Sequence, residues 1–160
     1  MNVKNHAMQY EIVTLPKKTV VGLCARTSNQ APDMSDKIGG LWRSLFEEGV
    51  YAAIPNKSTQ TTLGLYSDYA GDEKDAYDVT VGCEVALAEQ LPQGAICKTI
   101  PAGNYAKFII HGDPVNAVMQ FWMKLWELPL DRAFTADFEE YLPNDKDDGT
   151  CEIHIYISLK

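Results

Sequence analysis

The sequence contains no hydrophobic run of the ~18 residues that a membrane-spanning helix requires. Residues 1–10 also lack the apolar segment of a secretory signal peptide. Lys and Arg are scattered, and the formal net charge is −8 over 160 residues, so the basic patch that a nucleic-acid backbone requires is missing. We therefore expect a cytoplasmic protein that makes no direct contact with nucleic acid and does not insert into a membrane.

Closely spaced metal ligands and cysteine pairs are absent as well. The cysteines are Cys24, Cys83, Cys97 and Cys151, and the histidines are His6, His111 and His154. A disulfide framework or a zinc site favours closer pairs such as C-x-x-C. The spacing therefore predicts free, mostly buried thiols in a reducing compartment, and neither a metal nor a cofactor.

The conventional catalytic signatures are missing too. The sequence has no G-x-S-x-G nucleophile elbow, no H-E-x-x-H zinc motif, and neither Walker nor dinucleotide glycine spacing. Gly39-Gly40 falls inside a predicted helix, where close packing explains it better than phosphate binding does. The sequence therefore shows none of the conventional signatures of hydrolases, zinc peptidases or nucleotide-binding proteins.

What the chain does contain is a repeated order of elements. Alternating and helical hydrophobic patterns predict, in the first half, strands at 9–15 and 19–24, a helix around 38–46, and strands at 63–69 and 77–85. In the second half they predict strands at 96–100 and 105–110, a helix from Asp113-Pro114 to before Pro129, and strands at 132–141 and 151–159. The first two strands of each half are interpreted as a hairpin.

Short motifs support the repeat. Thr14-Leu15-Pro16 recurs as Thr99-Ile100-Pro101, and Leu41-Trp42 recurs as Leu125-Trp126. The pattern predicts one α+β domain over 1–160, with duplicated β-β-α-β-β modules at about 8–87 and 95–160. We expect antiparallel sheets related by a pseudo-two-fold axis and helices on one side. The opposite sheet faces would then form a central ligand cleft.

The strand at 132–141 carries the most informative pattern. Alternation places Phe134, Ala136 and Phe138 on one face, and Asp137, Glu139 and Tyr141 on the other. An apolar face in the core would thus hold carboxylates and a phenol on the opposite side. That side faces either solvent or a pocket, and alternation alone does not decide between them.

Other strands offer polar faces that could join this one. In the last strand, Glu152, His154 and Tyr156 point away from the aliphatic residues, and cross-strand neighbours come within reach of each other. In the first half, Glu84 and Tyr66 occupy comparable positions. Among the tryptophans, Trp122 is the one expected to contact a ligand, because two large rings on one short helical face cannot both be equally deep.

Several segments in this order resemble the GyrI-like small-molecule-binding domain. They are Ile38-Gly39-Gly40-Leu41-Trp42, Leu65-Tyr66-Ser67-Asp68-Tyr69, Val81-Gly82-Cys83-Glu84-Val85, Thr99 to Tyr105, Trp122 to Trp126, Asp137 to Tyr141 and Glu152-Ile153-His154-Ile155. This domain is also the effector-binding domain of AraC-type and MerR-type multidrug-responsive transcription activators. The chain is most similar to the free-standing, integron-associated effector-binding proteins.

The resemblance implies a duplicated fold with a central cleft for lipophilic, often cationic, drug-like molecules. It implies that Glu139, in the F-E-x-Y motif, is the buried acid that meets the ligand's positive charge. Glu152 matches a site glutamate of the family, whereas His154 replaces a tyrosine and Tyr156 stands where proline is usual. A histidine at that place could make binding depend on pH.

Two further readings remain open at this stage. Some GyrI-like proteins resemble hydrolases that open strained rings of toxic natural products, in which case Glu139 and Glu84 would act as general base and acid. Inhibition of another protein is a third reading, because gyrase inhibition is attributed to a family member. The sequence also leaves the oligomeric state open, a homodimer included.

Overall fold

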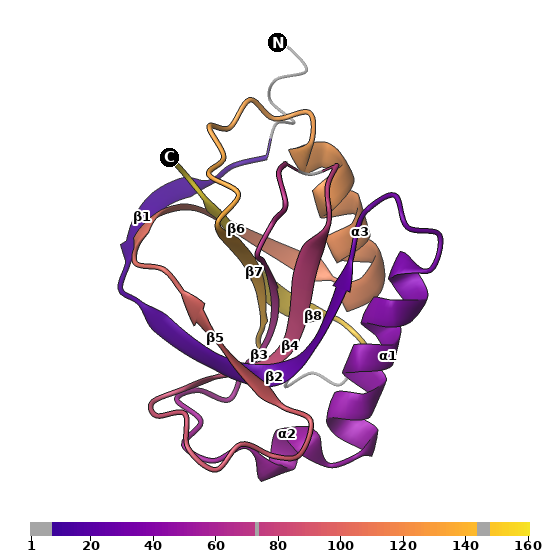
Figure 1. Cartoon of the computed structure of the whole chain (residues 1–160). Coiled ribbons are helices and arrows are strands. Elements are labelled where there is room, and N and C mark those ends of the chain that lie inside the picture. The colour runs from indigo at the N-terminus through magenta and orange to yellow at the C-terminus, as the bar shows by residue number, and fades with distance from the viewer. Residues whose placement is uncertain (1–7, 73, 144–147) are drawn as a thin grey trace.

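The computed structural model describes residues 8–72, 74–143 and 148–160 (Figure 1). Its helices are α1 (Met34–Glu47), α2 (Val50–Ala53) and α3 (Pro114–Leu125). Its strands are β1 (Glu11–Leu15), β2 (Lys18–Thr27), β3 (Thr62–Ser67), β4 (Tyr77–Val85), β5 (Ile96–Ile100), β6 (Gly103–Gly112), β7 (Ala136–Tyr141) and β8 (Cys151–Ser158). Each half therefore reads β-β-α-β-β, with the short α2 added in the first half.

All eight strands form one antiparallel sheet in the order β1-β6-β8-β7-β3-β4-β2-β5. The strands β1 to β4 correspond to β5 to β8 of the other half. When each strand is exchanged for its counterpart, the strand order stays the same but is read from the opposite edge of the sheet. This is the symmetry of a two-fold arrangement, with β3 and β7 paired at the centre. The predicted α+β class with antiparallel sheet is confirmed.

The two predicted hairpins, however, are wrong. β1 pairs with β6, where Ile12 lies opposite Ala106, and β5 pairs with β2, where Cys97 lies opposite Val21. The physical reason is that β2 is already flanked by β4 and β5, and β6 by β8 and β1. Each half thus gives its first strand to the sheet edge of the other half. Alternation identifies a strand and its faces but does not name its partner.

The predicted strand at 132–141 begins later, at Ala136. Phe134 has a φ of 55°, in the left-handed region that bulky side chains rarely adopt. The chain therefore turns before β7, and Arg132 makes only an isolated bridge with Leu159.

Two predicted helix-end signals agree with the structure, although α1 begins earlier than predicted, at Met34, and α3 ends at Leu125, short of the predicted end at Pro129. Gly49 adopts a φ of 75° just beyond α1, as a cap glycine does. At the start of α3, the carboxylate of Asp113 accepts a hydrogen bond from the Asn116 N–H at 2.8 Å, with Pro114 at the first helical position.

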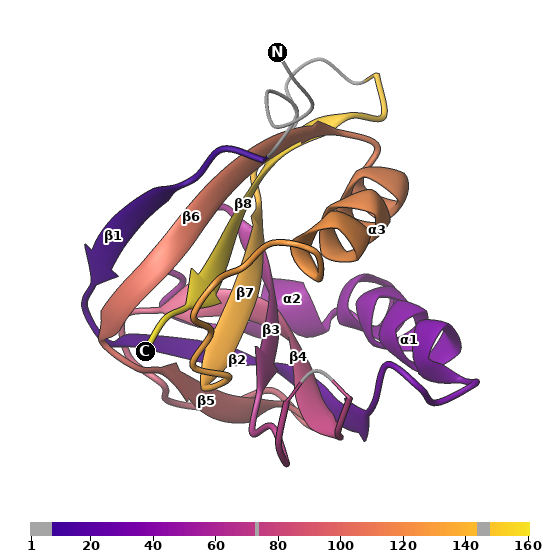
Figure 2. The ribbon, with the colours of Figure 1, turned by 90° about the horizontal axis from the view of Figure 1, so that it is seen from above.

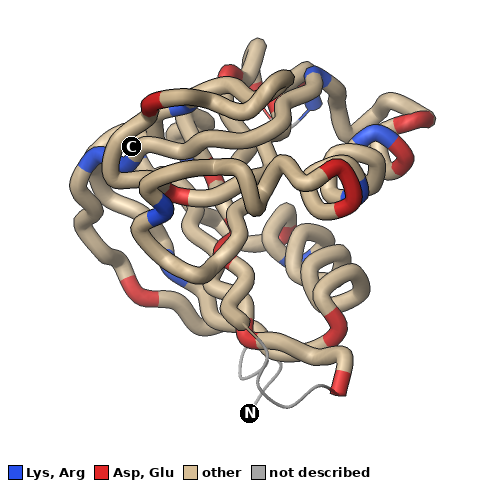
Figure 3. Tube along the Cα trace, turned by 90° about the horizontal axis from the view of Figure 1, so that it is seen from below, with Lys and Arg blue, Asp and Glu red and all other residues tan. Residues whose placement is uncertain are grey.

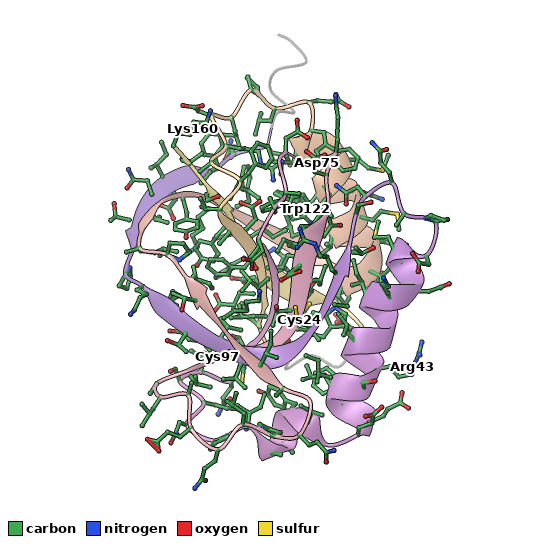
Figure 4. All side chains as sticks on the ribbon, in the orientation of Figure 1. Cys24, Arg43, Asp75, Cys97, Trp122 and Lys160 are labelled. Atoms are coloured by element: carbon green, nitrogen blue, oxygen red, sulfur yellow. The ribbon has the colours of Figure 1, made fainter. Side chains whose placement is uncertain are left out.

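Both long helices lie on the same side of the curved sheet (Figure 2). Beneath α3 a buried cluster includes Phe108, Phe121 and Ile155, and beneath α1 a second one includes Leu45 and Val79. Trp122 lies over the sheet within the molecule, whereas Arg43 points outward from α1 (Figure 4). Alternate positions of the strands therefore face the helices.

The other face of the sheet is a filled core and not the predicted cleft. Its buried cluster includes Leu65, Phe138 and Tyr156 from central strands, together with Ile100 of β5 and, packed against them, Leu15 of β1. The exchanged edge strands bring these apolar side chains over the concave face, because the sheet curls around them. The cavity between α1 and α3 therefore lies on the helix side of the sheet.

The distribution of charge, the hydropathy of the helices and the cysteines add three findings. Lys and Arg are dispersed over several elements among the acidic residues (Figure 3). No helix in the described part of the chain is long and apolar enough to cross a membrane. All four cysteines are unpaired, but only Cys83 is buried and Cys97 is exposed, so the expectation of mostly buried thiols is wrong.

Two isoleucines on opposite faces of neighbouring strands test this layering. Ile155 of β8 is 0% exposed under α3, and Ile109 of β6 is 51% exposed on the other face. Ile155→Ala should lower the free energy of unfolding by about 2–5 kcal/mol, because it leaves a cavity in the core. Ile109→Ala should cost less than about 1 kcal/mol. Chemical denaturation measures both, and equal losses would contradict the assignment of faces.

Candidate functional site

A cavity of about 640 Å³ lies between α1 and α3, above the paired centre strands β3 and β7. Its wall is mostly aromatic and aliphatic. The lining includes Met34, Ile38, Trp42 and Phe46 from α1, Val115, Val118, Met119, Trp122 and Met123 from α3, Trp126 just beyond α3, and Tyr66, Glu139 and Tyr141 from the sheet. Such a volume and lining suit a drug-sized apolar molecule.

Among the described residues, Glu139 is the one carboxylate that lines this cavity, and it is 1% exposed. Three donors converge on it. The phenol of Tyr141 donates to Oε1 at 2.6 Å, and the phenol of Tyr66 and the indole N–H of Trp122 donate to Oε2 at 2.9 and 2.7 Å. The site therefore joins β7, β3 and α3 through one side chain.

All three donors of Glu139 are neutral. Burial raises the pKa of the Glu139 carboxyl above its ordinary value of 4.5, and the hydrogen bonds from Tyr141, Trp122 and Tyr66 act in the opposite direction. Burial, together with the nearby Glu139, also raises the pKa values of Tyr66 and Tyr141, so both phenols stay protonated donors. Within the described ranges, no Lys, Arg or His side chain forms an ion pair with Glu139.

A second buried carboxylate, Asp137, shows the contrast. It is 0% exposed, yet Arg132 Nη2 lies 2.8 Å from its Oδ2. Tyr69 donates to the same oxygen at 2.5 Å, and the Ser158 backbone N–H donates to Oδ1 at 2.8 Å. Asp137 is thus charge-compensated within the protein and Glu139 is not.

Room for the Glu139 carboxylate comes from a glycine on the adjacent strand. Gly64 lies directly opposite Glu139 in the β3–β7 pair. A Cβ at position 64 would stand 3.1 Å from Glu139 Oε1 and 3.3 Å from the Trp42 ring. A larger residue there would push the acid or the indole, so the glycine fixes the shape of the cavity floor.

Of the seven sequence-predicted site residues, four meet at this cavity: Glu139, Tyr141, Tyr66 and Trp122. The other three do not. In the β7–β8 pair, Glu139 lies opposite Ile155, and His154 lies opposite Glu140. The predicted convergence of Glu152 and His154 with Glu139 is therefore wrong, because the register puts them on the reverse face.

On that reverse face the three polar side chains have other partners. His154 Nε2 lies 2.5 Å from Glu152 Oε2, and His111 Nε2 lies 3.2 Å from Glu152 Oε1. Glu84 forms an ion pair with Lys18 at 3.3 Å. Glu84 also alternates with Cys83 and Val85, which pack on the helix side near α2, so it faces away from the cavity.

Sequence reasoning missed several lining residues. Trp42 and Trp126 line the cavity beside Trp122, although a helical stripe usually indicates core. The recurrence of Leu-Trp in both halves was the available signal. Arg132 also lines the cavity and was not predicted, since its place follows from the turn at Phe134.

A duplicated α+β sheet with two helices around an aromatic cavity defines the chain as a GyrI-like effector-binding domain. The family model of integron-associated effector-binding proteins matches residues 11–159. The chain therefore belongs to the family of integron-associated effector-binding proteins. Among curated proteins, no sequence matches the chain.

Three solved structures are similar to this chain over nearly its whole length. An integron cassette protein from the mobile metagenome of Vibrio cholerae has 27% identity and a TM-score of 0.75, with 96% of this chain and 98% of that one covered. SAV2435, solved with tetraphenylphosphonium bound, has 21% identity and a TM-score of 0.75, with 96% and 94% covered. The C-terminal domain of EcmrR has 19% identity and a TM-score of 0.58, with 96% and 98% covered. The similarities to SAV2435 and to the EcmrR domain show a shared fold.

The raised pKa of Glu139 predicts a pH dependence of stability. Because the folded-state pKa is above the unfolded value near 4.5, folding takes up a proton between the two values. The free energy of unfolding should fall as pH rises through that window, by about 1.4 kcal/mol per unit of pKa difference. Glu139→Gln should lack this contribution.

The measurement is urea denaturation of both proteins from pH 4 to pH 8. The other titrations are common to the two, so the difference between their unfolding free energies isolates Glu139. A difference that stays constant over this range would contradict the raised pKa.

Proposed function

We propose that this protein binds amphipathic, lipophilic cations in the cavity between α1 and α3, with ionised Glu139 as the counter-charge. The observation that carries the proposal is a buried carboxylate, 1% exposed, that has three neutral donors and no cationic partner among the described residues. A buried charge is costly unless it is paired. A ligand that brings a positive charge supplies the missing partner.

The walls of the cavity favour the same ligand class. Trp42, Trp122 and Tyr66 present aromatic rings, whose faces attract cations and whose area attracts apolar groups. The methionines along the mouth, Met34, Met119 and Met123, are flexible and can adapt to different shapes. A lipophilic cation is attracted both by the faces of the aromatic rings and by the apolar surface, whereas a hydrophilic cation is attracted only by the ring faces.

The tetraphenylphosphonium complex of SAV2435 supports this ligand class by analogy, because tetraphenylphosphonium is a lipophilic cation and the two chains share the fold. The hydrolase reading has less support. It requires Glu139 and Glu84 to act on one substrate, and Glu84 lies on the reverse face in an ion pair with Lys18. We therefore place binding ahead of ring-opening hydrolysis.

Binding of tetraphenylphosphonium, followed by isothermal titration calorimetry, tests the proposal. Glu139→Gln should weaken binding at least about tenfold, because it removes the charge that compensates the cation. The matched control is Glu140→Gln, which changes the next carboxylate along the same strand. Glu140 accepts from Thr61 at 3.2 Å on the reverse face, so its change should leave affinity within about twofold.

A second ligand separates charge from shape. Tetraphenylborate has nearly the size and shape of tetraphenylphosphonium but the opposite charge. The wild type should discriminate strongly in favour of the cation, and Glu139→Gln should lose most of that discrimination. Equal binding of the cation to wild type and Glu139→Gln would overturn the counter-charge role.

A further inference from the structure

Arg132 has hydrogen-bonding capacity that the protein itself does not use. Its side chain is 10% exposed and lines the cavity beside Trp122. The guanidinium carries five N–H donors. Nη2 donates to Asp137 at 2.8 Å, and the buried Nε has no acceptor within the described part of the chain. Nε itself is shielded from solvent, so a ligand in the cavity can reach only the terminal N–H groups of this side chain, and Nη1 has no acceptor among the described residues.

The guanidinium is also held in place by two aromatic rings. It lies 4.3 Å from the ring centroid of Phe134 and 6.0 Å from that of Trp122. Phe134 reaches this position through its left-handed backbone, at a φ of 55°, and its ring also packs edge-on against Tyr69. Strained backbone of this kind clusters at sites where a side chain must be positioned. Arg132 is therefore a fixed donor and not a mobile surface arginine.

Several aromatic donors around the cavity are already used, whereas the indole N–H groups of Trp42 and Trp126 have no acceptor among the described residues. Tyr66, Tyr141 and Trp122 donate to Glu139, and Tyr69 donates to Asp137. The phenol of Tyr77 donates to the Asn29 side chain at 2.6 Å. The hydroxyls of Ser35 and Thr62 are also part of the lining. Among the described lining residues, Arg132 is the cationic donor, and its guanidinium has more N–H groups than Asp137 uses.

Charge compensation decides which acceptor suits this donor. The fully buried Asp137 already neutralises Arg132. A ligand carboxylate would add a negative charge beside the Arg132–Asp137 ion pair, which is already neutral. A neutral carbonyl oxygen adds no charge and needs only an N–H donor from Arg132. The position of this donor relative to Glu139 is also defined. The indole N–H of Trp122 points at Glu139 while its ring lies beneath Arg132, so one indole separates the two polar groups.

We propose that Arg132 forms a second polar subsite of the cavity, which takes a neutral hydrogen-bond acceptor on the same ligand whose cationic centre pairs with Glu139. This inference rests on the proposed function. The preferred ligand is then a lipophilic cation with a carbonyl oxygen about one aromatic ring away from its charge. Apolar surroundings alone would favour a ligand without that oxygen.

Two phosphonium probes of similar shape test the subsite. They are 4-acetylbenzyl-triphenylphosphonium, which carries the carbonyl one ring away from the charge, and 4-isopropylbenzyl-triphenylphosphonium, which lacks it. Calorimetric titration of the wild type should show the acetyl probe binding about tenfold more tightly, as a hydrogen bond to a charged donor allows. The isopropyl probe is the more lipophilic, so simple partitioning predicts the reverse order.

Arg132→Lys is the matched variant, because it keeps a cation for Asp137 but loses the planar set of donors. A double variant, Arg132→Met with Asp137→Asn, removes the buried charge pair as a unit and guards against misfolding from an unpaired Asp137. Both should bind the two probes with nearly equal affinity. The readout is the ratio of the two probe affinities within each variant, so a change that affects all ligands of the cavity alike cancels.

The outcomes are distinguishable from those of the proposed function. If the wild type binds the two probes equally, or if Arg132→Lys keeps the tenfold preference, the subsite is overturned while binding of the cation at Glu139 stands. If Arg132→Lys lowers only the thermal stability, Arg132 has a structural role alone and the subsite is likewise overturned. Failure of tetraphenylphosphonium to bind would instead overturn the proposed function.

Discussion

The buried carboxylate of Glu139 organises the cavity between α1 and α3, because side chains from both halves of the chain converge on it. Removing such a group from water costs several kcal/mol when no cation accompanies it. Hydrogen bonds to a charged group return about 1.5–3 kcal/mol each, so the three donors from Tyr66, Trp122 and Tyr141 offset much of that cost. The pKa is nevertheless raised, which means that the compensation is incomplete. This incomplete compensation supports the proposal that the positive charge of a ligand completes it.

The exchange of strands places this acid where both halves of the chain meet. β3 of the first half and β7 of the second are the central pair, and each half contributes one helix above them. Gly64 and Tyr66 come from the first half, and Glu139 and Trp122 from the second. The exchanged β1 and β5 close the apolar core on the reverse face, which leaves the helix side for the cavity. Neither half contains the site alone.

The sequence predicted the elements well because local signals define them. The cap at Asp113, the glycine after α1 and the alternation along β4 are all readable from neighbouring residues. The two hairpins were predicted wrongly, whereas the antiparallel pairing of the last two strands was right, since pairing is decided by which edges remain free in the whole sheet. The register between β7 and β8 separates His154 from Glu139 for the same reason.

The sequence likewise predicted only part of the candidate site. Glu139 and Tyr141 follow from alternation on one strand, and the family resemblance singled out Glu139 from Glu140. Trp42 and Arg132 were missed because their exposure to the cavity depends on how two helices and a turn are placed over the sheet. Long-range placement of this kind has no signature in a single sequence.

The most direct test of the central claim is the pKa of the Glu139 carboxyl, followed by NMR of ¹³C-labelled glutamate with Glu139→Gln for assignment. Without ligand, we expect a Glu139 pKa above 4.5, because burial outweighs the three hydrogen bonds. With tetraphenylphosphonium bound, we expect a lower pKa, since a cation that prefers the ionised acid must favour its ionisation in return. A Glu139 pKa that is unchanged by the bound cation would contradict the counter-charge role of Glu139.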